Sequence, residues 1–243
     1  MVCEVGMEKI TEFLTQVVIE ASKLITNDFW VKAKDDKGDL VTNFDLEVEK
    51  FIISRLIANY PEYKIVSEEF NSNECYCDNF FTIDPIDGTI NFANGLPFWG
   101  IQVACVKEGK PCSSVIFLPK LNELFVADSS GAYLNGEQIS VSKLEAKSCL
   151  YSIESKGKLA TECILNMIDC YPHQRKFYCA ALEFAYVACG RLGGIGFLSD
   201  NLWDYLPGCY LVERAGGVVS HKVANHIAAN SEQMLEVLTK YCK

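Results

Sequence analysis

Apolar residues recur every three or four positions in two stretches near the start of the chain, and each stretch predicts a helix. In the second stretch, Val48, Phe51, Ile52 and Leu56 mark one apolar face, and Pro61 ends the helix. The first stretch covers 10–25 and has the longer apolar face, formed by Ile10, Phe13, Leu14, Val17, Val18, Ala21, Leu24 and Ile25.

Short apolar runs follow these two helices, and they have the length and composition of β-strands. The pair Asn135-Gly136, which comes after the runs, is typical of a tight turn. The strands predicted from the apolar runs cover 64–66, 80–83, 101–106, 115–118 and 123–127.

Helical spacing returns in the last third of the chain. It predicts one helix over 177–189, stopped by Gly190, and another that begins at 203 or 204 and ends at 215. Asn230 with Gln233 three residues later resembles a capping box that opens a last helix. Helices come first, then strands, then mixed elements. This order favours a layered α+β fold over a regularly alternating, doubly wound sheet.

The composition is that of a folded protein with a substantial core. The chain has 243 residues, of which 49% are apolar, so it fits one large domain or two closely packed halves. The formal net charge of −10 disfavours nucleic-acid backbones, and we expect no nucleic-acid partner. No apolar run approaches the roughly 20 residues of a membrane span, so we expect no membrane partner either.

Twelve cysteines are many for this length, but the start of the chain does not indicate a secreted, disulfide-bonded protein. Residues 1–9 carry two glutamates and lack the basic, apolar lead of a signal peptide. We therefore expect a cytoplasmic protein whose thiols are free and mostly pack in the core. Cys75 and Cys77 form a tight pair, but without a second pair at finger-like spacing they do not predict a zinc site.

The predicted strand at 80–83 runs straight into two aspartates, Asp84 and Asp87, that are three positions apart. Pro85 stiffens the turn between them, and Gly88 lets the backbone approach a ligand closely. Carboxylates beside a glycine suit a cation and a phosphate together, because Mg²⁺ prefers oxygen ligands and shares them with substrate phosphates. For this segment alone, an ordinary acidic turn after a strand is the alternative.

Three further segments carry carboxylates at positions that metal chemistry could use. Glu68 and Glu69 follow the strand predicted at 64–66. Asp45 lies in the first turn of the second helix, and Asp204 opens a later one. One at a time, such residues are solvated side chains or charges that favour a helix N-terminus. The order in which these carboxylates occur together along the chain is a more specific signal than any one of them.

This ordered set of motifs resembles the inositol monophosphatase family, which comprises magnesium-dependent, lithium-sensitive phosphatases. The resemblance extends from about residue 7 to the end of the chain. It implies an α+β fold, the layered α-β-α-β-α sandwich that the family shares with fructose-1,6-bisphosphatase. The matching motifs are Asp39-Leu40-Val41-Thr42 with Asp45, Ser67-Glu68-Glu69, Asp84-Pro85-Ile86-Asp87-Gly88-Thr89 with Asn91 and Phe92, Trp203-Asp204 with Gly208, Ala215-Gly216-Gly217, and Ala228-Ala229-Asn230.

The resemblance also implies a single domain over 1–243. Its N-terminal part, about 1–145, would carry most of the metal ligands. Its C-terminal part, about 146–243, would carry Asp204 and the wall that contacts the substrate. A homodimer and inhibition by lithium are implied in the same way.

By the same resemblance, two to three Mg²⁺ ions would bind in the active site. Glu68, Asp84 and the backbone carbonyl of Ile86 would hold one ion. Asp84, Asp87 and Asp204 would hold a second, so that Asp84 bridges the pair. A third, looser ion would lie near Glu68.

The resemblance assigns further residues to the phosphate and to the attacking water. The backbone of Gly88 and Thr89 would hold the phosphate, and Lys34 would lie near the site. Glu68, Asp45 and Thr89 would position and deprotonate a metal-bound water. Two cations neutralise phosphate oxygens, lower the pKa of bound water and stabilise the leaving alkoxide. We therefore expect direct attack by water, without a covalent nucleophile.

The substrate wall departs from the family pattern. The family has a glutamate seven residues before the aspartate that Asp204 matches, and it contacts a substrate hydroxyl; here that position is Phe197. A Gly-Ser/Thr-Ala-Ala segment starts the wall helix in the family, whereas this chain reads Tyr178-Cys179-Ala180-Ala181. The residues expected to contact substrate or phosphate are Lys34, Asp87, Gly88, Thr89, Ala180, Phe197 and Asp204.

A phenylalanine at 197 cannot accept a hydrogen bond from a substrate hydroxyl and presents an apolar face instead. We therefore expect inositol 1-phosphate to be a poor substrate, whereas a flat group such as adenine could stack on Phe197. If the local alignment slips, Asp200 could supply the missing carboxylate.

The sequence thus predicts a phosphoric monoester hydrolase that acts on a small phosphorylated metabolite. Fructose 1,6-bisphosphate, 3′-phosphoadenosine 5′-phosphate, NADP and histidinol phosphate are alternative substrates for the same chemistry. A regulatory protein without catalytic activity is the alternative from another class, and the loss of metal ligands would indicate it. Glu68, Asp84, Asp87 and Asp204 are all present.

Overall fold

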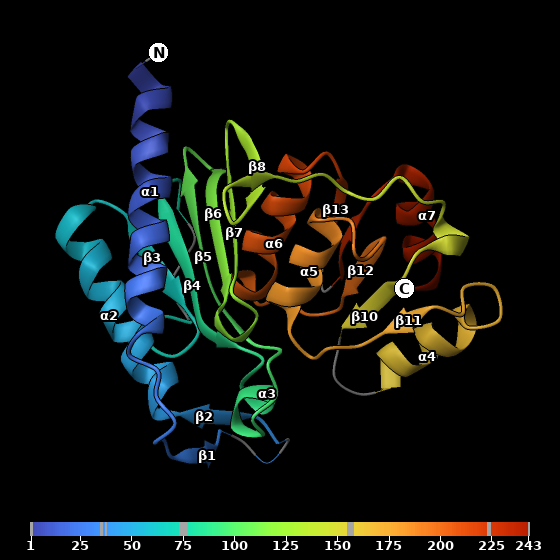
Figure 1. The fold of residues 1–243 in the computed structure, drawn as a ribbon, viewed down its shortest axis with the longest axis horizontal. Coiled ribbons are helices and arrows are strands. Elements are labelled where there is room, and N and C mark those ends of the chain that lie inside the picture. The colour runs from blue at the N-terminus through green and yellow to red at the C-terminus, as the bar shows by residue number, and fades with distance from the viewer. Residues whose placement is uncertain are drawn as a thin grey trace.

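The structure is a computed structural model, which describes residues 2–34, 36, 38–72, 77–154, 158–222 and 225–242. Its elements form five layers, in the order helices, sheet, helices, sheet, helices (Figure 1). This is the α-β-α-β-α sandwich that the sequence predicts. Cys75 lies outside the described residues, so the structure does not describe its pairing with Cys77. The described cysteines between Cys77 and Cys242 are free thiols, as predicted.

The large sheet contains all five strands that the apolar runs predict, each within a few residues of its expected bounds. In spatial order its strands are β3 (Lys64–Ser67), β4 (Phe80–Asp87), β5 (Gly100–Lys107), β6 (Lys110–Leu118), β7 (Glu123–Asp128), β8 (Gly131–Leu134) and β9 (Glu137–Gln138). The first pair is parallel and the others are antiparallel. Asn135 and Gly136, with φ of 51° and 85°, form the predicted tight turn between the last two strands.

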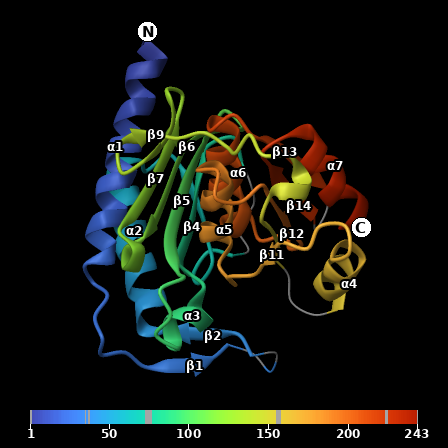
Figure 2. The same cartoon turned by 45° about the vertical axis from the view of Figure 1, so that its right-hand side comes forward.

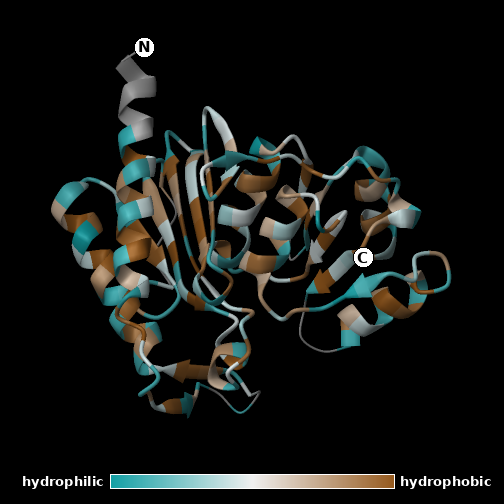
Figure 3. Ribbon diagram, in the orientation of Figure 1, coloured by the Kyte–Doolittle hydropathy of each residue, from teal (hydrophilic) through white to brown (hydrophobic). Residues whose placement is uncertain are grey.

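Two helices, α1 (Val2–Ser22) and α2 (Asn43–Asn59), cover one face of this sheet (Figure 1). Their apolar stripes are buried against the strands, and Leu14 and Ile52 are both fully buried. Figure 3 shows apolar residues along the strands and alternating with polar ones along α1. The prediction placed the end of α1 too late, because the helix stops at Ser22 and the side chain of Leu24 is exposed.

The middle layer consists of α5 (Ala180–Ala188) and α6 (Leu202–Arg214), which lie between the two sheets (Figure 2). The two helices pack closely. A Cβ atom at Gly208 would lie 2.3 Å from Cβ of Phe184, so only glycine fits this crossing. The prediction of α6 is confirmed to within two residues, but the prediction of α5 began three residues too early, since Tyr178 has a φ of 54°.

The second sheet supplies the far wall of the middle layer, and α4 (Lys158–Met167) and α7 (Glu232–Tyr241) cover its outer face (Figures 1 and 2). The predicted capping box at Asn230 is wrong. Ser231 is the N-cap of α7, and its hydroxyl accepts from the N–H of Met234 at 3.3 Å. The strands, in spatial order, are β11 (Gln174–Arg175), β10 (Tyr151–Glu154), β12 (Gly194–Phe197), β14 (Asn225–Ala229) and β13 (Val218–Lys222).

Short elements complete the described part of the chain: β1 (Val31–Ala33), which pairs with β2 (Leu40–Thr42), the helix α3 (Thr89–Ala93), and two 3₁₀ turns at Pro119–Leu121 and Ala146–Ser148. In this part of the chain, no helix is both long and apolar enough to cross a membrane.

Candidate active site

A cavity of about 700 Å³ lies where the end of β4 meets residues near the starts of α5 and α6. Asp45 lies just behind its lining, with Oδ1 3.2 Å from the hydroxyl of Thr89. The structure therefore brings the predicted site residues from distant parts of the chain to one place. Those that line the cavity are Lys34, Glu68, Asp84, Ile86, Asp87, Gly88, Thr89, Ala180, Phe197 and Asp204.

A bulge in β4 lets both aspartates of the central segment face this cavity. Asp84 pairs with Gln102 of β5 and Asp87 with Gly100, so three steps along β4 match two along β5. In a regular strand, residues three apart point to opposite faces of the sheet. The extra residue of a bulge cancels this alternation. Pro85, which has no N–H to give to the ladder, lies within the irregular stretch.

The carboxylates of Asp84, Asp87 and Asp204 all line the cavity, and their charges act on one another. Burial raises the pKa of all three, and the charges of neighbouring carboxylates raise it further. The pKa of Asp87 is raised to about 6. Oδ1 of Asp84 is buried and has no hydrogen-bond partner, which is a costly state for an acceptor. A cation placed here would stabilise all three groups.

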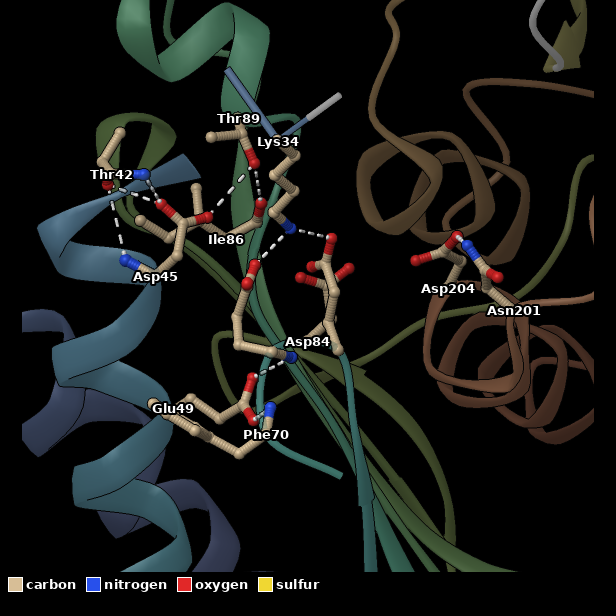
Figure 4. A network of polar contacts seen from close by, with 12 residues as sticks. Lys34, Thr42, Asp45, Glu49, Phe70, Asp84, Ile86, Thr89, Asn201 and Asp204 are labelled. Carbon is tan, nitrogen blue, oxygen red and sulfur yellow. Dashed lines mark hydrogen bonds and ion pairs between the residues drawn. The ribbon is translucent and has the colours of Figure 1, made fainter. Parts of the chain in front are cut away.

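The donor chemistry of the cavity fits a divalent cation, because carboxylate and carbonyl oxygens are the ligands that hard cations prefer. Among the described residues, however, no three His, Cys, Asp or Glu side chains are already gathered into a metal-binding group. Figure 4 shows Lys34, whose ammonium group contacts carboxylates at this side of the site. Nζ of Lys34 lies 2.7 Å from Oε1 of Glu68 and also donates to Glu69. The lysine thus serves as the counter-charge of Glu68.

Lys34 is held in place by the pair of strands that precedes α2. It follows β1, and its N–H donates to the carbonyl of Asp39, just before β2, at 2.7 Å. Burial lowers the pKa of Lys34, but the charge of Glu68 and the hydrogen bonds to both glutamates raise it more, so the ammonium stays protonated. Burial also raises the pKa of Glu69 to about 7, despite its bond to Lys34.

Asp45 has a structural role as well as a place beside Thr89. Its Oδ2 accepts from the N–H of Thr42 at 2.7 Å, while the hydroxyl of Thr42 caps the N-terminus of α2 in a capping box. Oδ1 faces the hydroxyl of Thr89, which also lies 2.9 Å from the carbonyl oxygen of Ile86 (Figure 4). Burial is the main cause that raises the pKa of Asp45.

Glu49 is a buried residue of α2 that the sequence reading did not single out. Its carboxylate accepts from the hydroxyl of Ser67 at 2.6 Å and from the N–H groups of Glu69 and Phe70 at 2.9 and 2.8 Å. These bonds fix the turn that presents Glu68 (Figure 4). A glutamate within a helical pattern resembles any surface charge, and only tertiary packing reveals this role.

Gln102 is a second such residue, and it connects the two halves of the site. Its Nε2 lies 3.4 Å from Oδ2 of Asp84 and 3.4 Å from the carbonyl oxygen of Asp204. Asp204 is also bound by the side chain of Asn201, at 3.1 Å (Figure 4). The signal for Gln102 is present in the sequence, as the one polar residue within the strand predicted at 101–106.

Asp87 joins the end of β4 to the start of α5. Its Oδ2 accepts from the N–H of Ala181 and lies 3.4 Å from Sγ of Cys179. Cys179 is therefore in contact with the site, whereas the sequence reading assigned the cysteines mostly to core packing. Asn91 holds the segment before α5, because its Nδ2 lies 2.7 Å from the carbonyl oxygen of Phe177.

Phe197 ends β12, and its ring is mostly buried. Its side chain is 5% exposed, and the ring lies 6.0 Å from that of Phe184 and 6.5 Å from that of Tyr205. It lines the cavity but offers a ligand little apolar surface. Asp200, the alternative carboxylate, lies outside the described lining of the cavity, with Oδ1 3.5 Å from Nε2 of His226.

Tyr178 stands where the family pattern has glycine, and its backbone shows why. Its φ of 54° is in the left-handed region, and its exposed ring lines the cavity. We expect Tyr178→Gly to be more stable than Tyr178→Ala by about 1 kcal/mol, because only glycine adopts this φ without strain. Urea unfolding of the two variants measures the difference.

The matched control is Glu162, an exposed residue in the middle of α4. There the order is expected to reverse, with Glu162→Ala more stable than Glu162→Gly by about 1 kcal/mol, because alanine has the higher helix propensity. A Tyr178→Ala variant at least as stable as Tyr178→Gly would contradict the strain assigned to this position.

The layers and the carboxylate-lined cavity place the chain in the class of α-β-α-β-α sandwich proteins. Residues 6–237 match the profile of the Inositol monophosphatase family. The chain is 36% identical over 207 residues to the "Fructose-1,6-bisphosphatase/inositol-1-monophosphatase" of Thermotoga maritima, with 82% of this chain and 79% of that protein covered. It is 33% identical over 222 residues to "Nus factor SuhB" of Escherichia coli, with 87% and 79% covered. The chain belongs to the inositol monophosphatase family.

Solved structures agree with this assignment. The Thermotoga maritima IMPase superposes with a TM-score of 0.84 at 30% identity, with 97% of each chain covered. The extragenic suppressor protein suhB of Bartonella henselae superposes with a TM-score of 0.85 at 26% identity, with 97% of this chain and 99% of that one covered. The resemblance inferred from the motifs and the fold that it implied are both confirmed.

Proposed function

We propose that this protein is a phosphoric monoester hydrolase that acts on a small phosphorylated metabolite with the help of Mg²⁺. The observation that carries the proposal is that the carboxylates of Asp84, Asp87 and Asp204 line one cavity, where Asp84 is buried and its Oδ1 has no hydrogen-bond partner. Such a concentration of negative charge is unfavourable by itself and becomes favourable when cations and a phosphate bind. Membership of the inositol monophosphatase family supports the same activity.

In this proposal the carboxylates of Glu68, Asp84, Asp87 and Asp204 and the carbonyl of Ile86 would hold two to three ions. Bound there, the ions would neutralise phosphate oxygens and lower the pKa of a bound water. Lys34, already close to Glu68 and Glu69, would move or share these carboxylates when cations bind.

The chain's own residues would then orient the water. The hydroxyl of Thr89 lies between two acceptors, Asp45 and the carbonyl of Ile86, and this fixes its direction. A water held by Thr89 and Glu68 would lose its proton toward Asp45 or Glu68 as its oxygen attacks phosphorus in line. The P–O bond to the leaving group breaks, and the alkoxide takes a proton from solvent. Burial is the main cause that raises the pKa of Asp45, which is the direction that favours a carboxylate as a general base.

Relatives named "Nus factor SuhB" favour a second candidate, a regulatory protein that works through another macromolecule. This candidate leaves open whether a nucleic acid is among the partners, although the net charge of −10 disfavours direct contact with one. The homodimer and the inhibition by lithium stay predictions that rest on the family resemblance, and the cytoplasmic location stays a prediction from the sequence alone.

Phosphate release distinguishes the two candidates. We expect the purified protein with Mg²⁺ to release phosphate from at least one compound of a panel containing inositol 1-phosphate, fructose 1,6-bisphosphate, 3′-phosphoadenosine 5′-phosphate, NADP and histidinol phosphate. A colorimetric phosphate assay measures the rates. Protein that is folded by circular dichroism and loaded with Mg²⁺, yet inactive on the whole panel and on 4-nitrophenyl phosphate, would favour the regulatory candidate.

A further inference from the structure

The second sheet brings a carboxylate to the cavity that the sequence reading did not single out. Glu154 is the last residue of β10, lines the cavity together with Phe197, and is only 9% exposed. In the parallel pair of β10 and β12, Glu154 lies directly opposite Phe197. Side chains opposite each other in a ladder project from the same face of the sheet. Glu154 therefore stands beside Phe197, one strand away.

Glu154 and Phe197 contribute differently to this wall of the cavity. The ring of Phe197 packs against Phe184 of α5, and little of it reaches the cavity. The carboxylate of Glu154, by contrast, is a charged group that lines the cavity. The family pattern has its glutamate at position 197, so in this chain the carboxylate is present but comes from the neighbouring strand.

A second buried acid, Glu183 of α5, lies near Glu154. Glu183 is completely buried, and its Oε1 accepts from the N–H of Phe177 at 2.6 Å. Burial and then the charge of Glu154 raise the pKa of Glu183 well above its ordinary value. Of these two acids, Glu154 is the one that lines the cavity.

We propose that Glu154 is the specificity-determining residue of this cavity and that its carboxylate accepts a hydrogen bond from a hydroxyl or ammonium group on the leaving group of the phosphate ester. The inference rests on the proposed phosphatase function and adds to it the kind of substrate. Hydrogen bonds to a carboxylate are stronger than those between neutral groups. A leaving group without a donor would not form this bond and would gain less from binding.

This inference opposes the expectation drawn from Phe197 alone. Phe197 predicts that hydroxyl-rich esters such as inositol 1-phosphate are poor substrates, whereas Glu154 predicts that they are preferred to esters without a donor. One set of assays decides between the two. The probes are inositol 1-phosphate with hydroxyl donors, phosphoethanolamine with an ammonium donor, and 4-nitrophenyl phosphate with neither.

The test measures kcat/KM for the wild type, Glu154→Leu and Glu154→Gln. For each protein, kcat/KM with a donor substrate is divided by kcat/KM with 4-nitrophenyl phosphate, and these ratios are compared. We expect Glu154→Leu to lower the ratio for at least one donor substrate about tenfold to a hundredfold, and Glu154→Gln to lower it less, because an amide still accepts one hydrogen bond. Glu137→Gln, at an exposed strand end far from the lining, is the control and should leave the ratio unchanged.

The outcomes distinguish the role of Glu154 from the phosphatase function itself. A fall confined to inositol 1-phosphate identifies a hydroxyl as the donor, and a fall confined to phosphoethanolamine identifies an ammonium. Ratios that stay within twofold in both Glu154 variants overturn the inference while the phosphatase function stands. No phosphate release by the wild type from these probes or from any compound of the panel above overturns both. The exchange variant Glu154→Leu with Phe197→Glu, if folded, should recover part of the lost ratio.

Discussion

Asp87→Asn is expected to lower kcat at least about a hundredfold while leaving the protein folded. The substitution removes one charge from the carboxylates that line the cavity, and in the proposed mechanism a cation held there would stabilise the leaving group. An asparagine oxygen still accepts the hydrogen bond from Ala181, so the link between β4 and α5 survives. Because the repulsion among the carboxylates also falls, the metal-free variant should be at least as stable as the wild type.

Steady-state kinetics at saturating Mg²⁺ and urea unfolding in chelator measure the two effects of Asp87→Asn. Asp128→Asn is the matched control, because Asp128 also ends a strand of the large sheet and also holds a turn, through the N–H of Ser130. It lies outside the lining of the candidate site and should leave kcat unchanged. Turnover of Asp87→Asn within a few fold of the wild type would remove Asp87 from the proposed machinery.

Removing divalent cations with a chelator is expected to abolish phosphate release and to make stability depend on pH. The pKa of Asp87 is raised to about 6, from an ordinary value near 4. Between these values the folded state binds more protons than the unfolded state, so the free energy of unfolding falls as the pH rises. Asp84 and Asp204, whose pKa values are raised too, act in the same direction.

In chelator we therefore expect the protein to be more stable at pH 5 than at pH 8, by on the order of 1 kcal/mol for Asp87 alone. Mg²⁺ should raise stability at pH 8 and flatten this dependence, because a bound cation compensates the ionised carboxylates. Thermal unfolding at both pH values, with and without Mg²⁺, measures the effect. Equal stability at the two pH values in chelator, together with no response to Mg²⁺, would argue against a cation site here.

The large sheet could be predicted from the sequence, but the second sheet could not. The strands β3 to β7 are apolar runs bounded by turn residues, and hydrophobic periodicity identifies them. The strand β12 is Gly194–Phe197, and its glycines read as signs of a loop. In the structure these glycines allow α7 and the C-terminal segment to approach. A Cβ at Gly194 would lie 2.7 Å from Leu238, and one at Gly196 would lie 2.9 Å from Sγ of Cys242.

The candidate site, too, could be predicted only in part from the sequence. The motifs could predict which carboxylates gather, since each of them follows a strand or opens a helix, and the structure brings them to one cavity. The position of Glu154 could not be predicted, because it depends on how a strand ending at 154 pairs with one ending at 197. Glu49 and Gln102 likewise act through partners that are distant in the sequence.

The bulge in β4 has a consequence for the spacing of the two aspartates. If the two aspartates were two residues apart on a regular strand, their side chains would also point to the same face of the sheet. The longer spacing adds a residue without a counterpart across the ladder, since neither Pro85 nor Ile86 has a one-to-one partner on β5. The carbonyl of Ile86 is therefore available to the hydroxyl of Thr89 and to a ligand in the cavity. In the proposed metal site, the length of this segment would thus supply a neutral oxygen ligand that no side chain provides. We expect a one-residue deletion to keep the charges but to change which cations the site prefers.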